Sequence, residues 1–154
     1  MAYDVKFKDV PAQEVLAVRD RVTLGTVSER LGAAFGEIMA CGQAAGATYA
    51  GPPFVLYPER FDETTEGAII VCMPVAPGAA GAGRVTPEEV PVARVAYTMH
   101  VGAYHEISPA YEALMAAMTA DGLSPGGAPR EIYLNDPGTV PEHALLTEID
   151  WPVA

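Results

Sequence analysis

The chain has 154 residues, half of them hydrophobic, and carries a formal net charge of -11 at pH 7. This length suits a single domain with a core of its own, and the apolar content argues against disorder. The acidic balance argues against nucleic acid as a partner, because phosphate contacts need Lys and Arg. No apolar run reaches the roughly 18 residues of a membrane-spanning helix. The start, Met1–Lys8, is polar and has no signal-peptide pattern, so we expect a cytoplasmic protein.

Motifs for metals and cofactors are missing from the sequence. Cys41 and Cys72 lie in apolar stretches without CxxC spacing, which favours buried thiols over metal ligands or a disulfide. His100 and His105 are five residues apart, which is not a metal-binding spacing. The chain also has no GxSxG, P-loop or GxGxxG pattern. We therefore expect neither a metal nor a cofactor.

Hydrophobic periodicity predicts two series of elements in the same order. After a short opening segment that Pro11 ends, the first series has a strand, a helix and two further strands, at 14–24, 27–45, 54–57 and 67–75. The second series has the same four elements, at 92–101, 107–123, 129–135 and 144–151. The glycine-rich stretch 76–90 between them is predicted to be a surface loop or linker.

The two series match residue by residue, which indicates an internal duplication. Gly25 corresponds to Gly102, Tyr57 to Tyr133, and residues 73–75 (Met-Pro-Val) to residues 151–153 (Trp-Pro-Val). We therefore predict one domain over residues 1–154, with repeat halves at about 13–75 and 91–153. The fold class is α+β, a duplicated βαββ unit. Its antiparallel sheet has both helices on one face and a ligand cleft at the pseudo-twofold axis on the other.

Positions at which the halves differ are the candidates for function. Glu131 stands where the first half has Val55, and Glu148 stands where it has Ile70. Carboxylates are disfavoured in the middle of strands, so these two residues need an explanation.

Strand alternation predicts where these side chains point. If Ile132 and Leu134 meet the helices, Glu131 and Tyr133 face the groove, and Glu148 joins them from the last strand. A pair of close, buried carboxyls would suit a cationic ligand or acid–base chemistry on water. The alternative is that both glutamates lie on a solvated sheet face, as is common in antiparallel sheets.

Three segments carry a resemblance to a known family. They are 94–104 (Arg-Val-Ala-Tyr-Thr-Met-His-Val-Gly-Ala-Tyr), 130–137 (Arg-Glu-Ile-Tyr-Leu-Asn-Asp-Pro) and 147–153 (Thr-Glu-Ile-Asp-Trp-Pro-Val). The chain resembles the GyrI-like small-molecule-binding family, the effector-binding domain of AraC- and MerR-type multidrug regulators, from about Val5 to Val153. The resemblance implies a duplicated βαββ fold with a ligand cleft that binds hydrophobic, often cationic compounds between aromatic rings.

The resemblance also implies site residues. By motif position these are the acids Glu131 and Glu148 with Tyr133 and Trp151. The aromatic candidates added to them are Tyr97, Tyr57 and Phe54.

Three functions follow as hypotheses. The first is a stand-alone binder of small hydrophobic or cationic molecules. The second is a cofactor-free hydrolase of cyclopropane-bearing alkylating compounds, with Glu131 and Glu148 as the catalytic pair. The third is a gyrase-inhibitor-like interaction protein. Because the chain has no helix-turn-helix segment, we do not expect it to bind DNA by itself.

Overall fold

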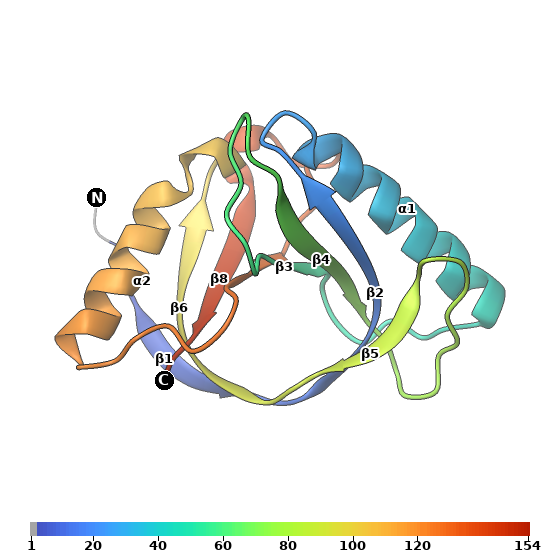
Figure 1. The fold of residues 1–154 in the computed structure, drawn as a ribbon, viewed down its shortest axis with the longest axis horizontal. Helices are drawn as coiled ribbons and strands as arrows, with labels where there is room; N and C mark the ends of the chain where they lie inside the picture. The colour runs from blue at the N-terminus through green and yellow to red at the C-terminus, as the bar shows by residue number, and fades with distance from the viewer. Residues whose placement is uncertain (1–2) are drawn as a thin grey trace. The chain divides into compact units, whose positions relative to one another are not determined.

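The computed structural model describes residues 3–154, which form an α+β fold with two helices and eight antiparallel strands (Figure 1). Neither helix is long and apolar enough to cross a bilayer. In chain order the elements are β1 (Lys6–Val10), β2 (Gln13–Val22), α1 (Val27–Ala45), β3 (Phe54–Leu56), β4 (Gly67–Pro74), β5 (Thr86–Val90), β6 (Ala93–Val101), α2 (Ser108–Ala120), β7 (Arg130–Tyr133) and β8 (Leu146–Pro152).

The chain divides into two compact units. Ala12–Pro91 forms the β2 unit, in which the strands pair in the order β3-β4-β2-β5. Val92–Ala154, together with the described residues up to Pro11, forms the β6 unit, in which they pair in the order β1-β6-β8-β7. Each unit therefore has the one helix and three strands that the duplication predicts, and a fourth antiparallel strand that it does not predict.

The edge strands β1 and β5, which lie outside the predicted repeats, are exchanged relative to chain order. β1 precedes β2 in the chain but pairs with β6, and β5 precedes β6 but pairs with β2. The predicted linker is therefore wrong over residues 86–90, which form β5. The strand is hard to predict from the sequence because proline and charged residues are unfavourable in a central strand. Pro87 and two glutamates are tolerated here because β5 is an edge strand with one unpaired side.

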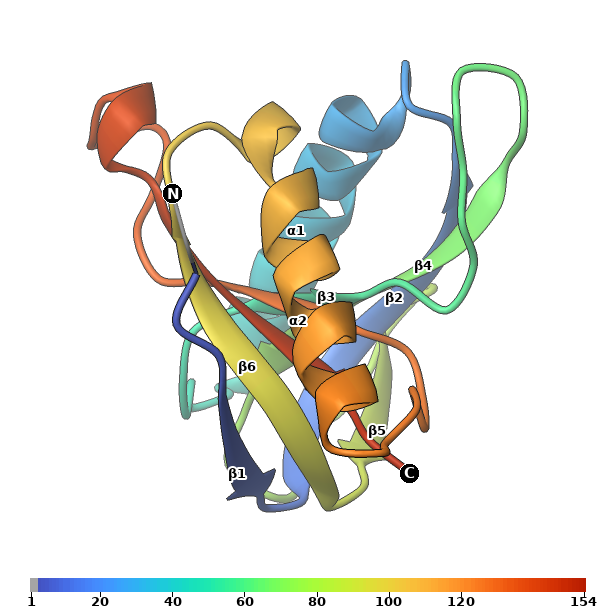
Figure 2. The same ribbon diagram turned by 90° about the vertical axis from the view of Figure 1, so that its left-hand side faces the viewer.

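The two helices bury equivalent residues. α1 buries Ala34 and Ile38, and α2 buries Ala110 and Leu114 at the matching positions. The spacing of four residues places each pair on one helix face. α1 packs on β2 and β4, and α2 packs on β6 and β8; Figure 2 shows α2 lying along the strands of its unit. α1 ends at Gly46, whose φ of 65° is the left-handed conformation that glycine adopts without strain.

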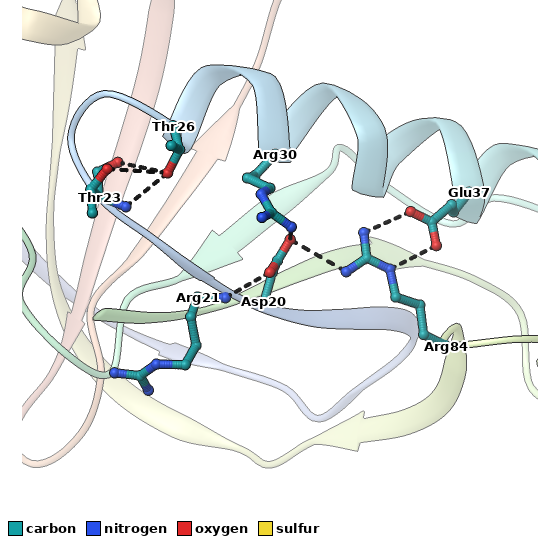
Figure 3. Close-up of polar contacts among 7 residues, drawn as sticks. All are labelled: Asp20, Arg21, Thr23, Thr26, Arg30, Glu37 and Arg84. Atoms are coloured by element: carbon teal, nitrogen blue, oxygen red, sulfur yellow. Dashed lines mark hydrogen bonds and ion pairs between the residues drawn. The ribbon is translucent and has the colours of Figure 1, made fainter. Parts of the chain in front are cut away.

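A network of ions ties the loop before β5 to the rest of the β2 unit (Figure 3). The Arg84 guanidinium donates to both carboxylate oxygens of Glu37 on α1, at 2.7 and 2.6 Å, and to Asp20 on β2 at 3.3 Å. Asp20 also accepts hydrogen bonds from the Arg30 side chain at 3.4 Å and the Arg21 amide at 2.8 Å. The network therefore joins β2, α1 and the loop at one carboxylate.

The pKa of Asp20 lies below its ordinary value. Burial acts to raise it, but the hydrogen bonds from the Arg21 amide and Arg84, with the charges of Arg30 and Arg84, outweigh burial. Asp20 is therefore ionised at neutral pH. Its contribution to stability is present above the unfolded-state pKa of about 3.9 and is lost as the pH falls through the lower folded-state value.

We predict that Arg84→Met lowers the thermal unfolding midpoint at pH 7 more than Arg21→Met does. Arg21 also faces two carboxylates, Glu59 at 3.3 Å and Glu66 at 3.7 Å, but all three side chains are more than half exposed and solvent screens them. The difference between the variants is expected to shrink as the pH falls below the unfolded-state pKa and through the lower folded-state pKa of Asp20. Equal midpoints for the two variants at pH 7 would contradict the role given to the Arg84 network.

Candidate ligand-binding site

The register of β7 on β8 decides which face each glutamate occupies. Glu131 lies directly opposite Ile149, and Ile132 lies directly opposite Glu148. Residues directly opposite each other in an antiparallel pair share a face. Ile149 belongs to the core under α2, so Glu131 lies on the α2 face and Glu148 on the other. The prediction that the two glutamates line one groove is therefore wrong.

The predicted orientation of β7 is also reversed. We expected Ile132 to meet the helix and Glu131 to face away from it. In the structure Ile132 shares the face of Glu148, and the side chain of Leu134 is 37% exposed. Alternation allows either side of β7 to face α2, and choosing the more hydrophobic side gave the wrong orientation. Ile149 of β8 already fills the core at this point, and a tyrosine on α2 donates a hydrogen bond to the glutamate.

Glu131 is bonded at both carboxylate oxygens. The Tyr111 hydroxyl on α2 donates to Oε2 at 2.6 Å, and the Tyr133 hydroxyl donates to Oε1 at 3.1 Å. A carboxyl group on a helix-covered face is costly to bury unless such donors are present. α2 and β7 together therefore hold this carboxyl group in a fixed place.

Two further aromatic rings extend the cluster. The Trp151 ring lies edge to face with Tyr111, with 5.7 Å between centroids and 74° between planes. The Tyr104 ring meets Tyr133 in the same way, at 5.6 Å and 71°. Tyr104 is 37% exposed, so the cluster reaches solvent at this residue. These five residues, Glu131, Tyr104, Tyr111, Tyr133 and Trp151, are called the Glu131 site.

The electrostatics of the site follow from burial and from acidic neighbours. Burial raises the pKa of Glu131, and the hydrogen bonds from Tyr111 and Tyr133 and the proximity of His100 only partly offset it. Burial also raises the pKa of Tyr104, with smaller contributions from the charges of Asp136 and Glu131. The site can therefore hold a carboxylic acid that donates a proton, or a carboxylate that attracts a cation.

The structure brings together three of the predicted site residues and adds two. Glu131, Tyr133 and Trp151 meet on the α2 face of the β6 unit. Sequence reasoning assigned Tyr111 to the helix core, although it stands where the first repeat has Phe35 and so differs from it by one hydroxyl group. The comparison of repeats that singled out Glu131 would also have found Tyr111, had it been extended to aromatic residues.

Glu148 and Tyr97 lie together on the opposite face, with a lysine between them. Lys8 of β1 donates to Glu148 Oε2 at 2.7 Å, and its ammonium group lies 4.2 Å from the centroid of the Tyr97 ring. Asp150, which lies opposite Tyr97, is almost fully buried. Its burial, and then its hydrogen bond and proximity to Glu148, raise the pKa of Asp150 to about 8. The protonated form of Asp150 is therefore favoured at neutral pH, beside Glu148 and Lys8.

The remaining predicted residues belong to the β2 unit. Phe54 begins β3 and is 2% exposed. Tyr57 follows β3, and its ring centroid lies 6.2 Å from that of Phe61. Both are placed within the β2 unit.

The family model of the GyrI-like small molecule binding domain matches residues 3–154. The chain therefore belongs to the GyrI-like family of small-molecule-binding domains. No curated protein matches its sequence.

Solved structures share the fold at low sequence identity. The EcmrR C-terminal domain is 23% identical, with 100% of this chain and 99% of that chain covered and a TM-score of 0.88. A hydrolase from Listeria innocua is 17% identical, with 99% and 93% covered and a TM-score of 0.75. SAV2435, solved bound to tetraphenylphosphonium, is 14% identical, with 100% and 94% covered and a TM-score of 0.59.

We predict that Asp150→Asn changes how stability depends on pH. Because the folded-state pKa of Asp150, about 8, exceeds its unfolded value, the stability that is fully present below about pH 4 is lost progressively as the pH rises to about 8. The slope for one such group is at most about 1.4 kcal/mol per pH unit. Asparagine can donate to Glu148 as the protonated acid does, so the variant should match the wild type below about pH 4, exceed its stability increasingly as the pH rises to about 8, and keep that advantage at pH 9.

Urea unfolding at several pH values measures this difference. Asp9→Asn is the matched control, because Asp9 is an exposed carboxylate paired with the exposed Arg94 at 3.2 Å. This variant should change the pH dependence little. Parallel stability curves for Asp150→Asn and the wild type from pH 5 to 9 would show that Asp150 does not hold a proton.

Proposed function

We propose that the Glu131 site binds a small organic cation with an apolar body. The observation that carries the proposal is a half-buried carboxyl group, bonded at both oxygens by tyrosine hydroxyls and flanked by aromatic rings that reach solvent at Tyr104. Aromatic faces and a desolvated negative charge both attract organic cations.

Two independent facts support this class of ligand. The family to which the chain belongs is defined by small-molecule binding. SAV2435, which shares the fold, was solved with tetraphenylphosphonium, a cation enclosed by four phenyl rings. The chain's net charge of -11 would also concentrate cations near the protein.

The test is a calorimetric titration of tetraphenylphosphonium into the wild type, Glu131→Gln and Glu148→Gln at pH 8. This pH favours the ionised form of a carboxyl group whose pKa is raised. Glu131→Gln removes the charge inside the site, and we expect the Kd to rise roughly 5- to 30-fold, which corresponds to about 1–2 kcal/mol.

Glu148→Gln is the matched control, because it makes the same substitution one strand away on the opposite face of the unit. It should leave the Kd nearly unchanged, once circular dichroism has shown that the variant is folded. A neutral analogue, triphenylphosphine oxide, should bind the wild type and Glu131→Gln alike. An equal loss of cation binding in the two variants would indicate that net charge, and not the Glu131 site, attracts the ligand.

Hydrolysis of a reactive electrophile is a second candidate. It is favoured by the raised pKa of Glu131, which suits a proton donor, and by the hydrolase from Listeria innocua that shares the fold. Glu148 lies on the opposite face, so the donor would be Glu131 without a partner carboxylate from β8. Mass spectrometry after incubation with a cyclopropane-bearing alkylating compound tests this candidate. Product in excess of protein, lost in Glu131→Gln, would establish turnover, whereas a stoichiometric complex alone would exclude it.

A further inference from the structure

A buried histidine lies behind the solvent-facing wall of the Glu131 site. His100 is 3% exposed, and it lies in β6 directly opposite Thr147, which in turn lies opposite Tyr133. His100 therefore shares the α2 face with Tyr133. Its two ring nitrogens are both engaged, one by the N-terminal segment and one by the loop that follows β6.

The hydrogen bonds define the tautomer of this ring. His100 Nε2 lies 2.8 Å from the carbonyl oxygen of Ala103. A carbonyl only accepts, so Nε2 carries the proton. In the neutral ring Nδ1 is then an acceptor, and the Tyr3 hydroxyl, at 2.8 Å, donates to it. Tyr3 and the Ala103 carbonyl thus fix the orientation of the ring from its two sides.

The Ala103 carbonyl is the point at which the chain turns toward the site. It also accepts from the Glu106 amide at 3.1 Å, which closes the short 3-10 turn Tyr104–Glu106. Gly102, just before it, has a φ of 127°, a conformation that other residues rarely adopt. His100 therefore anchors the first carbonyl of the turn that carries Tyr104.

We propose that Tyr3 and His100 are positioning residues that hold Tyr104 against Tyr133 and so set the affinity of the Glu131 site. Tyr104 meets the Tyr133 ring edge to face, and the Tyr133 hydroxyl donates to Glu131. The contacts thus run without a break from the N-terminal segment to the carboxyl group. This inference rests on the proposed function for its effect on binding, but the placement of Tyr104 can be measured without a ligand.

The other repeat shows that this arrangement is specific to the β6 unit. Val15 faces Pro74 as Val95 faces Pro152, so Asp20 in β2 is the counterpart of His100. Asp20 bonds Arg30 and Arg84 and forms an ionic network instead of a link to an aromatic wall. The two residues at this position, Asp20 and His100, therefore each bond a neighbouring loop. Only His100 is connected in this way to the Glu131 site.

The first variant is Tyr3→Phe, which removes one hydroxyl and keeps the ring that lies 6.1 Å from His100. In the ligand-free protein we expect the nuclear Overhauser contacts between the Tyr104 and Tyr133 rings to weaken. In the titration with tetraphenylphosphonium we expect the Kd to rise about fivefold, the effect of losing one neutral hydrogen bond.

Thr98→Val separates this role from simple docking of the N-terminus. The Thr98 hydroxyl donates to the Asp4 carbonyl at 2.9 Å, so the variant loosens the same segment without touching His100. It should leave the ring contacts and the Kd close to the wild-type values. A loss equal to that of Tyr3→Phe would mean that the segment acts only through its attachment, and it would overturn the proposal.

A double-mutant cycle with Tyr104→Ala completes the test. If Tyr3 acts through Tyr104, Tyr3→Phe changes the Kd little once Tyr104 is alanine. A full fivefold loss in that background, or intact Tyr104–Tyr133 contacts in ligand-free Tyr3→Phe, would overturn the proposal. If Glu131→Gln leaves cation binding unchanged while the ring contacts depend on Tyr3, the proposed function fails and the positioning of Tyr104 stands.

Discussion

The pairing of β7 with β8 is the constraint on which the chemistry of the β6 unit depends. With Glu131 opposite Ile149, the glutamate lies on the face that α2 covers, where Tyr111 and Tyr133 bond it. A shift of one residue would exchange the faces of Glu131 and Ile132 and separate the carboxyl group from both tyrosines. The buried Ile149, held in the core by Leu114 and Met118, opposes such a shift. An apolar contact therefore fixes the position of the polar group.

The duplication explains why the scaffold is nearly symmetric while its chemistry is not. Packing imposes the same demands on both repeats, so Ala34 and Ile38 recur as Ala110 and Leu114. Buried polar groups are not constrained in the same way, because each needs a hydrogen-bond or ion-pair partner of its own. The β2 unit uses Asp20 to join charged side chains at its surface, whereas the β6 unit has His100 at the matching position and Glu131 beneath aromatic rings.

The sequence predicted the features that depend on local periodicity. The bounds 27–45 for α1 agree with the structure, and the strand–helix–strand–strand order recurs in both units. It could not predict which strands pair across long separations, so the partner of β1 and the strand β5 were missed. The two faces of β7 were confused because Ile132 and Glu131 alternate equally well in either orientation. Tyr111 was missed because a tyrosine on an apolar stripe serves the core and the site alike.

The exchange of edge strands has a consequence for how the chain acquires its structure during synthesis. The partner of β1 is β6, which lies more than 80 residues later in the chain. β1 is therefore synthesised long before β6, and until β6 is made its backbone groups have no strand partner. Its sequence, Lys-Phe-Lys-Asp-Val, places charges on a strand that would otherwise invite pairing with another nascent chain. In the folded chain Lys8 reaches Glu148 and Phe7 packs against the core under α2, so the β6 unit is completed by a strand that precedes the whole β2 unit in the chain.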